Sequence, residues 1–314
     1  MSKLSSKPDL VSFNESPILV IPTLLSRNTL PATLDSVMPC MDLFHRVFIS
    51  LNGPRSESYS PSLDTFSRVY QDRCILLRTG KELTALDHVA FIARNTERLL
   101  HPQQSLMILC DDDLLGPREN LKEYFDFLKF NNGSVVGMGN FATFQNYPKS
   151  FDKPIQNLGA EESIRPTEFV ARTRLKAHFS NLSTMTMSAK IFQDSIFFMS
   201  RFGSSGFFIE YIFAAHRSAS SLYSPRSVTA YIRQHSNSES LTLAYVSFVH
   251  DEIIYFLWVW LNQPLARPFT PGYLKYGLSF YRFRGIVFER FYLFLKFNFP
   301  WLLGLYVWLK NRLT

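Results

Sequence analysis

Short, continuous apolar runs alternate with amphipathic stretches over roughly the first 110 residues. The runs are bounded by polar or turn-forming residues, which is typical of buried strands, and the segments between them carry apolar residues at helical spacing. The predicted strands are Ile18–Pro22, Val47–Leu51, Cys74–Leu77 and Ser105–Leu109, and the predicted helices are Thr29–Val37, Ser62–Gln71 and Leu83–Leu100. Such alternation indicates an α/β fold with a mostly parallel sheet flanked by helices, in which ligands bind beyond the carboxyl ends of the strands.

The pattern is less regular in the second half of the chain. The stretch from Asn140 to Arg174 is rich in polar residues and proline, and we expect it to form loops or a lid. Around it, the pattern predicts helices at 118–130, 189–199 and 209–218 and strands at 134–138, 182–187 and 228–232. Beyond residue 240 the chain is expected to be helical and aromatic, with a hinge marked by Pro264, Pro268 and Pro271.

Charge singles out the C-terminal segment. The chain has 33 Lys and Arg against 26 Asp and Glu, and its net charge of +7 resides in residues 267–314, which hold eight basic residues and one acid. The same segment has 15 aromatic residues interleaved with the basic ones. A basic, aromatic helix suits the headgroup region of an anionic membrane. The alternative is an extension packed on the core or in a dimer, which would bury many charged side chains at a cost.

The cysteines, the N-terminal residues and the lengths of the apolar stretches indicate the cellular compartment that we expect for this chain. Cys40, Cys74 and Cys110 are far apart, so neither a disulfide framework nor a structural zinc site is indicated. Residues 1–16 are polar and do not resemble a secretory signal. The longest uncharged apolar stretches are shorter than the ~20 residues that span a bilayer. We therefore expect a protein of a reducing compartment, without a transmembrane helix.

Three consecutive acids, Asp111, Asp112 and Asp113, follow the predicted strand Ser105–Leu109 after only Cys110. Acidic triplets are common on solvated turns, but here the strand holds them at the functional edge of the sheet, where like charges crowd unless a cation neutralises them. Mg²⁺ or Mn²⁺ takes one or two carboxylates and fills its other positions with phosphate oxygens and water. The triplet therefore predicts a divalent-metal site and a phosphorylated substrate.

From Ile18 to Ser240 the chain resembles the family 2 glycosyltransferases of the GT-A fold, many of which assemble bacterial surface polysaccharides. The matching segments are Leu19-Val20-Ile21-Pro22-Thr23, Asn52, Leu83–His88 and Cys110-Asp111-Asp112-Asp113, the last being similar to the Leu-Gly-Asp-Asp-Asp of one subgroup. The resemblance implies that Asp113 binds Mn²⁺ or Mg²⁺ bridging the diphosphate and that Asp111 lies near the ribose. It also implies a nucleotide-sugar site that includes Pro22, Thr23, Asn52, Asp87, Asp111 and Asp112.

Two later positions extend the resemblance. Many members carry Tyr-Arg-x-His-x-x-Ser-x-Ser, and Tyr231–Ser240 is similar, with one residue inserted after the Tyr or with Ile232 in its place. The match implies that Arg233 contacts the diphosphate and that His235 completes the metal site, the alternative being a structural histidine. The family also places a general base at the start of a helix before this motif, which implies that role for Glu210. The alternative for Glu210 is an acid that complements the helix dipole.

Together these matches imply a glycosyltransferase that moves a sugar from a nucleoside-diphosphate sugar to a hydroxyl of a lipid-linked or polysaccharide acceptor, in surface glycan synthesis. The resemblance also implies that the transfer inverts the anomeric configuration. We divide the chain into a polar lead (1–16), a catalytic domain (17–240) and a membrane-associating helical tail (241–314). The nucleotide-sugar half of the catalytic domain is about 17–117, and the acceptor half is about 118–240. The expected location is the cytoplasm, peripherally on the inner face of the cell membrane.

Two other classes of function stay open. A noncatalytic partner in a glycan assembly complex would keep the fold, but the presence of Asp111, Asp113, Glu210 and His235 favours an enzyme. A nucleic-acid-binding protein would be basic around its groove, whereas the predicted cleft is acidic and only the tail is basic, so we expect no nucleic-acid partner. The sequence contains no phosphate-loop, dinucleotide-binding or nucleophile-elbow motif, which disfavours ATPases, dehydrogenases and α/β-hydrolases.

Overall fold

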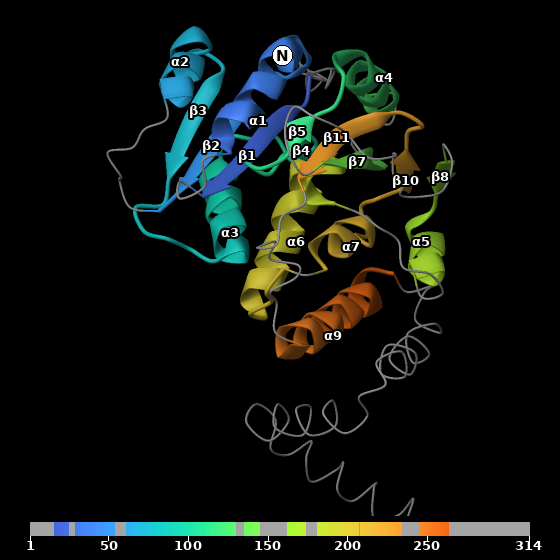
Figure 1. The fold of residues 1–314 in the computed structure, drawn as a ribbon. Helices are drawn as coiled ribbons and strands as arrows, with labels where there is room; N and C mark the ends of the chain where they lie inside the picture. The colour runs from blue at the N-terminus through green and yellow to red at the C-terminus, as the bar shows by residue number, and fades with distance from the viewer. Residues whose placement is uncertain are drawn as a thin grey trace, which may run out of the picture. The chain divides into compact units, whose positions relative to one another are not determined.

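A computed structural model of the chain describes residues 16–24, 29–53, 61–129, 135–144, 162–173, 181–206, 208–233 and 245–263 (Figure 1). The chain divides into two units, Met1–Pro264 and Leu265–Thr314. The division falls at Pro264, the first of the prolines at which the sequence predicts a hinge. The described residues all belong to the first unit, and the basic aromatic segment 267–314 lies outside them.

The larger sheet has eight strands in the order β3-β2-β1-β4-β9-β6-β10-β8. Strands β1, β2, β3 and β4 are parallel, as are β6 and β10, while β9 and β8 run antiparallel to their neighbours. The bounds are β1 Ile18–Leu24, β2 Val47–Asn52, β3 Cys74–Arg78, β4 Ser105–Ile108, β6 Val135–Met138, β8 Glu162–Ile164, β9 Met185–Ser188 and β10 Ser221–Ser224. This is the mostly parallel sheet that the sequence predicts.

A smaller sheet of three strands lies beside the carboxyl end of β4. It has the order β5-β11-β7, with β5 antiparallel and β7 parallel to β11. The bounds are β5 Leu114–Leu115, β7 Asn140–Phe144 and β11 Val228–Arg233. Since β5 follows the acidic triplet directly, the pairing of β5 with β11 carries the end of β11 to the triplet.

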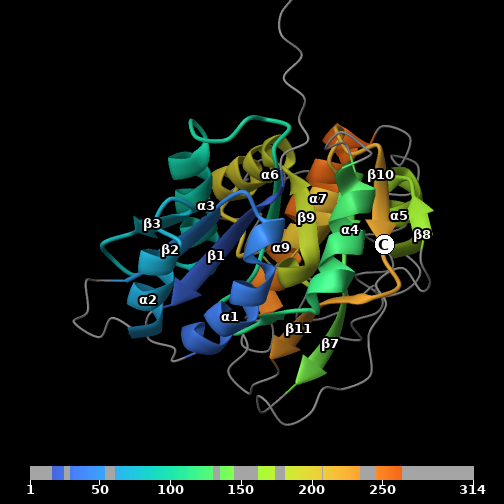
Figure 2. The same ribbon diagram turned by 90° about the horizontal axis from the view of Figure 1, so that it is seen from above.

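Helices cover both faces of the central sheet (Figure 2). Helices α1, α2 and α4 lie on one face, and α3 and α6 lie on the other, where α7 and α9 adjoin α6. The bounds are α1 Leu30–Val37, α2 Pro61–Val69, α3 Ala85–Thr96, α4 Arg118–Lys129, α5 Pro166–Thr173, α6 Ala189–Arg201, α7 Ile209–Ala214 and α9 Tyr245–Asn262, with 3-10 helices η1 Met38–Leu43 and η2 Leu182–Thr184.

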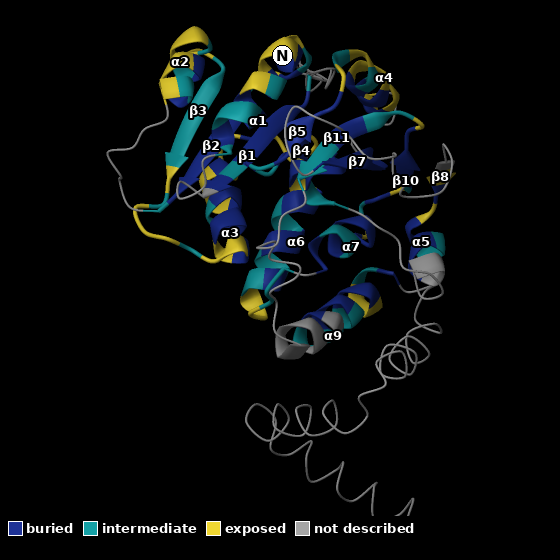
Figure 3. Cartoon of the chain, in the orientation of Figure 1, coloured by how far each residue is buried: buried dark blue, intermediate teal, exposed yellow. Residues whose placement is uncertain are grey.

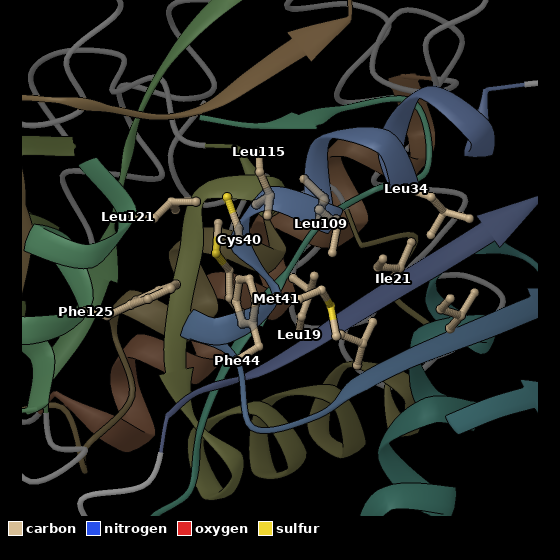
Figure 4. Packing of buried hydrophobic residues seen from close by; sticks show 14 of the residues in the cluster. Leu19, Ile21, Leu34, Cys40, Met41, Phe44, Leu109, Leu115, Leu121 and Phe125 are labelled. Atoms are coloured by element: carbon tan, nitrogen blue, oxygen red, sulfur yellow. The ribbon is translucent and has the colours of Figure 1, made fainter. Parts of the chain in front are cut away.

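The main apolar core fills the space between β1, β2, β4 and the helices α1, η1 and α4 (Figure 4). Strand β2 is buried along its whole length, which explains why its first three residues are all apolar and its sequence does not alternate strictly (Figure 3). Each fully buried Leu, Ile or Phe stabilises the fold by about 2 kcal/mol relative to an exposed one. Core residues include Leu19, Ile21, Leu34, Cys40, Met41, Phe44, Leu109, Leu121 and Phe125.

The structure corrects the prediction that Asn140 to Arg174 forms loops or a lid. Strands β7 and β8 and helix α5 lie within this stretch, although residues 145–161 are outside the described part. Polar Asn140 is compatible with a buried strand because its side chain is satisfied: Nδ2 donates to the carbonyl oxygens of Pro225 and Arg226, and Oδ1 accepts the Ser224 hydroxyl. These partners are distant in sequence, so the local pattern could not reveal the strand.

Smaller differences concern the segments that follow. The predicted strand Leu182–Met187 is divided into η2 and β9, and the predicted helix 209–218 ends at Ala214 as α7. Strand β10 was not predicted. The other predicted strands and helices within the described residues agree with the structure to within a few residues at their ends.

Candidate active site

The acidic triplet lies at the carboxyl edge of the central sheet, next to the end of β1. Strand β4 pairs with β1 only as far as Val20 opposite Ile108, whereas β1 continues to Leu24. The chain after β4 turns past the end of β1, where the Thr23 hydroxyl donates a hydrogen bond of 2.7 Å to Asp111 Oδ2. Both side chains are buried. The structure thus brings together two residues that the sequence assigns to the nucleotide-sugar site.

Helix α1 holds the backbone of the acidic turn. Thr33 Oγ1 lies 2.8 Å from the carbonyl oxygen of Asp111 and 2.8 Å from that of Asp113, so its hydroxyl is shared between two backbone acceptors. The Asp113 N–H donates to the carbonyl of Cys110 at 3.1 Å and closes the turn. Sequence reasoning missed Thr33, because a buried threonine on a helix has no pattern that marks such a contact.

Both oxygens of the buried Asp113 carboxylate accept hydrogen bonds. Ser183 Oγ donates to Oδ2 at 2.5 Å, and the backbone N–H of Arg233 donates to Oδ1 at 2.9 Å. The Ser183 hydroxyl in turn accepts the N–H of Cys110 at 2.9 Å. Residues 70 and 120 positions further along the chain therefore orient this carboxylate.

The chemistry of this turn fits a hard divalent cation. Burial, and next the negative charge of Asp112, raise the pKa of Asp113 from 3.8 to about 8, while the hydrogen bonds from Ser183 and Arg233 oppose the shift. A cation would relieve this crowding of charge. Among the described residues, no three His, Cys, Asp or Glu side chains are grouped so as to hold a metal alone. The donors therefore suit Mg²⁺ or Mn²⁺, which is held by one or two carboxylates together with substrate phosphates, and do not suit a closed zinc site.

Arg233 ends β11 beside the acidic turn. Its Nε donates to the Asp112 carbonyl at 3.1 Å, and its guanidinium lies 5.0 Å from the centroid of the Phe144 ring. Stacking on a ring and a backbone hydrogen bond hold this planar cation in place. The positive charge thus lies where the sequence predicts a diphosphate contact. His235, the second predicted residue of this motif, lies outside the described residues.

Glu210 lies in the first turn of α7, as the sequence predicts, and its side chain is partly buried. Burial raises its pKa from 4.5 to about 7, although its own N–H and that of Leu182 favour the ionised form. A carboxyl with a pKa near 7 exchanges a proton readily at neutral pH, which suits a general base. Leu182 directly precedes Ser183, so the single turn η2 both influences the pKa of Glu210 and donates a hydrogen bond to Asp113.

Asn52 and Asp87 lie at a neighbouring position on the same sheet edge. The buried Asn52 amide pairs with the backbone of Leu83, since Nδ2 donates to its carbonyl and Oδ1 accepts its N–H, both at 2.8 Å. Thr84 caps the start of α3: its side chain accepts the N–H of the exposed Asp87 and donates to the Asp87 carboxylate at 2.8 Å. Asn52 therefore fixes the segment that presents Asp87.

A buried histidine that the sequence reasoning did not single out lies under this edge. His88 Nε2 on α3 is 2.8 Å from Ser50 Oγ on β2, and Ser50 is opposite Pro22 in the register of β1 and β2. Burial lowers the pKa of His88 to about 4, so its ring is neutral at pH 7. This pair fixes α3 to the sheet next to Pro22, a predicted nucleotide contact.

Helix α9 packs on α7 and on the loop before it. The buried Asp251 accepts two hydrogen bonds from Ser205, one from its N–H at 2.8 Å and one from its hydroxyl at 2.6 Å. Trp258 Nε1 donates to the Ile212 carbonyl at 2.8 Å. The element that carries Glu210 is thereby fixed at both ends. Within the described part of the chain, no helix, α9 included, has the length and apolar character to cross a membrane.

No family model and no curated protein matches this sequence. Solved structures do match: the crystal structure of S. aureus TarS has a TM-score of 0.58 at 12% identity, over 85% of this chain and 44% of TarS. TarS 1-349 in complex with UDP-GlcNAc has a TM-score of 0.54 at 12% identity, over 85% of this chain and 74% of that one. The complex of TarS 1-349 with UDP gives 0.53 at 10% identity, over 86% and 74%.

These similarities establish the fold. The chain has the GT-A fold that the sequence predicts, a mostly parallel sheet flanked by helices with an acidic turn at its carboxyl edge. It spans less than half of the length of the TarS structure that it matches first.

Proposed function

We propose that this protein is a metal-dependent glycosyltransferase of the family 2 type, which moves a sugar from a nucleoside-diphosphate sugar to an acceptor hydroxyl. The observation that carries the proposal is the buried acidic turn at the carboxyl edge of a GT-A sheet, with the cation of Arg233 fixed beside it. An acidic turn next to a guanidinium suits a diphosphate that arrives with a divalent cation. TarS, whose fold this chain shares, was crystallised with UDP-GlcNAc and with UDP.

In this proposal, different residues at the sheet edge contact different parts of the nucleotide-sugar donor. Asp113, together with His235, holds Mn²⁺ or Mg²⁺, and Asp111 lies near the ribose. A cation held there would neutralise charge on the diphosphate and so make the nucleoside diphosphate a better leaving group. Arg233 contacts the diphosphate. The rest of the nucleotide-sugar site is formed by Pro22, Thr23, Asn52, Asp87 and Asp112.

Glu210 acts as the general base. Its carboxylate accepts the proton of the acceptor hydroxyl while the hydroxyl oxygen forms a bond to the anomeric carbon of the sugar. The bond from that carbon to the diphosphate oxygen breaks, and its electron pair leaves with the nucleoside diphosphate. Attack opposite the leaving group inverts the anomeric configuration. The support for this role is a carboxyl whose pKa of about 7 lets it hold or release a proton at neutral pH.

The acceptor side of the proposal rests on the C-terminal segment. Eight basic residues and 15 aromatic ones within residues 267–314 suit an anionic membrane surface and hence a lipid-linked or polysaccharide acceptor at the inner face of the cell membrane, in surface glycan synthesis. Replacing Arg282, Arg284 and Arg290 together by Gln is expected to lower cosedimentation with anionic vesicles at low salt. Unchanged sedimentation would contradict the membrane contact.

The deciding experiment is calorimetric titration of the protein with UDP, GDP, dTDP and CDP, first with Mn²⁺ and then with EDTA. Binding of one nucleotide that EDTA abolishes would support the proposal and identify the donor class. A folded protein that binds none of the four would favour the second candidate, a noncatalytic GT-A partner in glycan assembly.

A further inference from the structure

The hydroxyl of Ser183 makes two hydrogen bonds to the acidic turn. It is fully buried, donates to Asp113 Oδ2 at 2.5 Å and accepts the N–H of Cys110 at 2.9 Å. Because an N–H can only donate, the Cys110 contact uses a lone pair of the serine oxygen and leaves its proton for Asp113. An ionised carboxylate can only accept, so the serine proton is donated to Asp113.

The turn that carries Ser183 is itself fixed. Asn181 caps η2, since its Oδ1 accepts the Ser183 N–H at 2.8 Å and its carbonyl accepts the Thr184 hydroxyl at 2.8 Å. The Thr184 carbonyl accepts the N–H of Gly139 at 3.0 Å, which joins η2 to the segment between β6 and β7. With these contacts, η2 is a rigid support rather than a free loop end.

The turn η2 also lies near the second acid, Glu210. The backbone of Leu182, one residue before Ser183, is near enough to the carboxyl of Glu210 to lower its pKa. Two acids 97 positions apart, one on the turn after β4 and one on α7, thus both have a neighbour in η2.

We propose that Ser183 is a positioning residue: its hydroxyl sets the orientation in which Asp113 presents its carboxylate to the divalent cation, and η2 holds this carboxylate at a fixed place relative to Glu210. The inference rests on the proposed function, because it takes Asp113 as the metal-binding acid. Partners that orient a metal ligand typically affect metal affinity by about 10- to 100-fold when they are removed.

The test compares the full-length wild type with Ser183→Ala and Ser183→Cys. Cysteine keeps a side chain of similar shape but is a weak donor, so it answers the same question if the alanine variant does not fold. Ser195→Ala is the matched control, because Ser195 is equally buried but its hydroxyl has no hydrogen-bond partner among the described residues. The measurement is the Mn²⁺ concentration that gives half-maximal binding of whichever of UDP, GDP, dTDP or CDP the wild type binds, with melting temperature as a check on folding.

We expect this Mn²⁺ concentration to rise about 10- to 100-fold in the Ser183 variants and to stay unchanged in the control. Any binding that persists in EDTA should be equal in all four proteins, which a general loss of structure would not produce. If wild type and Ser183 variants need the same Mn²⁺ concentration, the role of Ser183 is overturned while the proposed function stands. If the wild type binds none of the four nucleotides with Mn²⁺, the proposed function and this inference are overturned together.

Discussion

The acidic turn after β4 and the first turn of α7 each hold a carboxyl group with a raised pKa, but for different reasons. At Asp113, burial is reinforced by neighbouring carboxylates, and both oxygens already accept hydrogen bonds. At Glu210, burial alone raises the pKa, and two backbone N–H groups oppose it. A cation relieves crowded charge, whereas a proton relieves a single carboxyl that is partly withdrawn from water. The difference supports the proposal that the first region binds the metal and the second transfers a proton.

The largest effect is expected when the negative charge of Asp113, the acid of the first region, is removed. Asp113→Asn should abolish Mn²⁺-dependent nucleotide binding and lower sugar transfer by at least about 10³-fold, because an amide is a poor ligand for a hard cation. Calorimetry and a transfer assay measure the two effects. Asp126→Asn, at a half-exposed position on α4, is the control and should behave as wild type. Normal metal-dependent binding by Asp113→Asn would remove this residue from the site.

The corresponding substitution in the second region, at Glu210, should affect sugar transfer but not nucleotide binding. Glu210→Gln keeps the shape but cannot accept the acceptor proton, so transfer should fall by about 10²- to 10⁴-fold while Mn²⁺-dependent nucleotide binding stays unchanged. Single-turnover kinetics with binding measured in parallel would show the split. Glu97→Gln, an exposed position after α3, serves as control. Equal transfer rates for Glu210→Gln and wild type would exclude Glu210 from the mechanism.

A pH experiment tests the cause of the Glu210 shift. With a pKa of about 7 in the folded chain and 4.5 in the unfolded one, this carboxyl holds a proton between these pH values that the unfolded chain has lost. Its contribution to stability is therefore full below pH 4.5, declines as pH rises towards 7 and levels off above that. Urea unfolding of metal-free protein across this range should give a smaller negative slope for Glu210→Gln than for wild type. Parallel curves would mean that the carboxyl is not buried in solution.

The smallest expected effect concerns the support of the second region. Asp251→Ala leaves the N–H and hydroxyl of Ser205 without their acceptor, which should cost about 1–3 kcal/mol of stability. Because Ser205 precedes α7, we expect transfer to fall a few-fold while nucleotide binding stays the same. Asp64→Ala, at an exposed position on α2, is the control for loss of an aspartate. A larger loss of nucleotide binding than of transfer would show that α9 supports the first region instead.

The sequence predicts those strands and helices whose local hydrophobic pattern matches their burial in the structure. Strand β2 is mostly apolar because it is buried on both faces, and Asp111 could be placed at the sheet edge because it follows closely on a strand. Strand β7 could not be predicted in this way, since Asn140 is made compatible with burial by carbonyl groups 85 and 86 positions away.

The same distinction applies to the site. Thr23, Asp111, Asp113 and Arg233 belong to recognisable motifs, and the structure brings them together. Thr33 and Ser183 are single hydroxyls whose partners lie 70 to 80 positions away, and no local pattern distinguishes them from other buried hydroxyls. Their roles follow only from the packing of α1 and η2 against the turn.

The hydrogen bond from the Arg233 backbone to Asp113 also bears on the order in which the protein folds. It joins residues 120 positions apart, and it depends on β11, the last strand of the described chain. Contacts at such separation form late, because a long loop must be closed before they are made. During synthesis, a chain that has emerged only as far as α6 lacks this partner for its acidic turn. The carboxylates can therefore reach their final arrangement only when the first unit is nearly complete, so the proposed cation site would form at the end of folding.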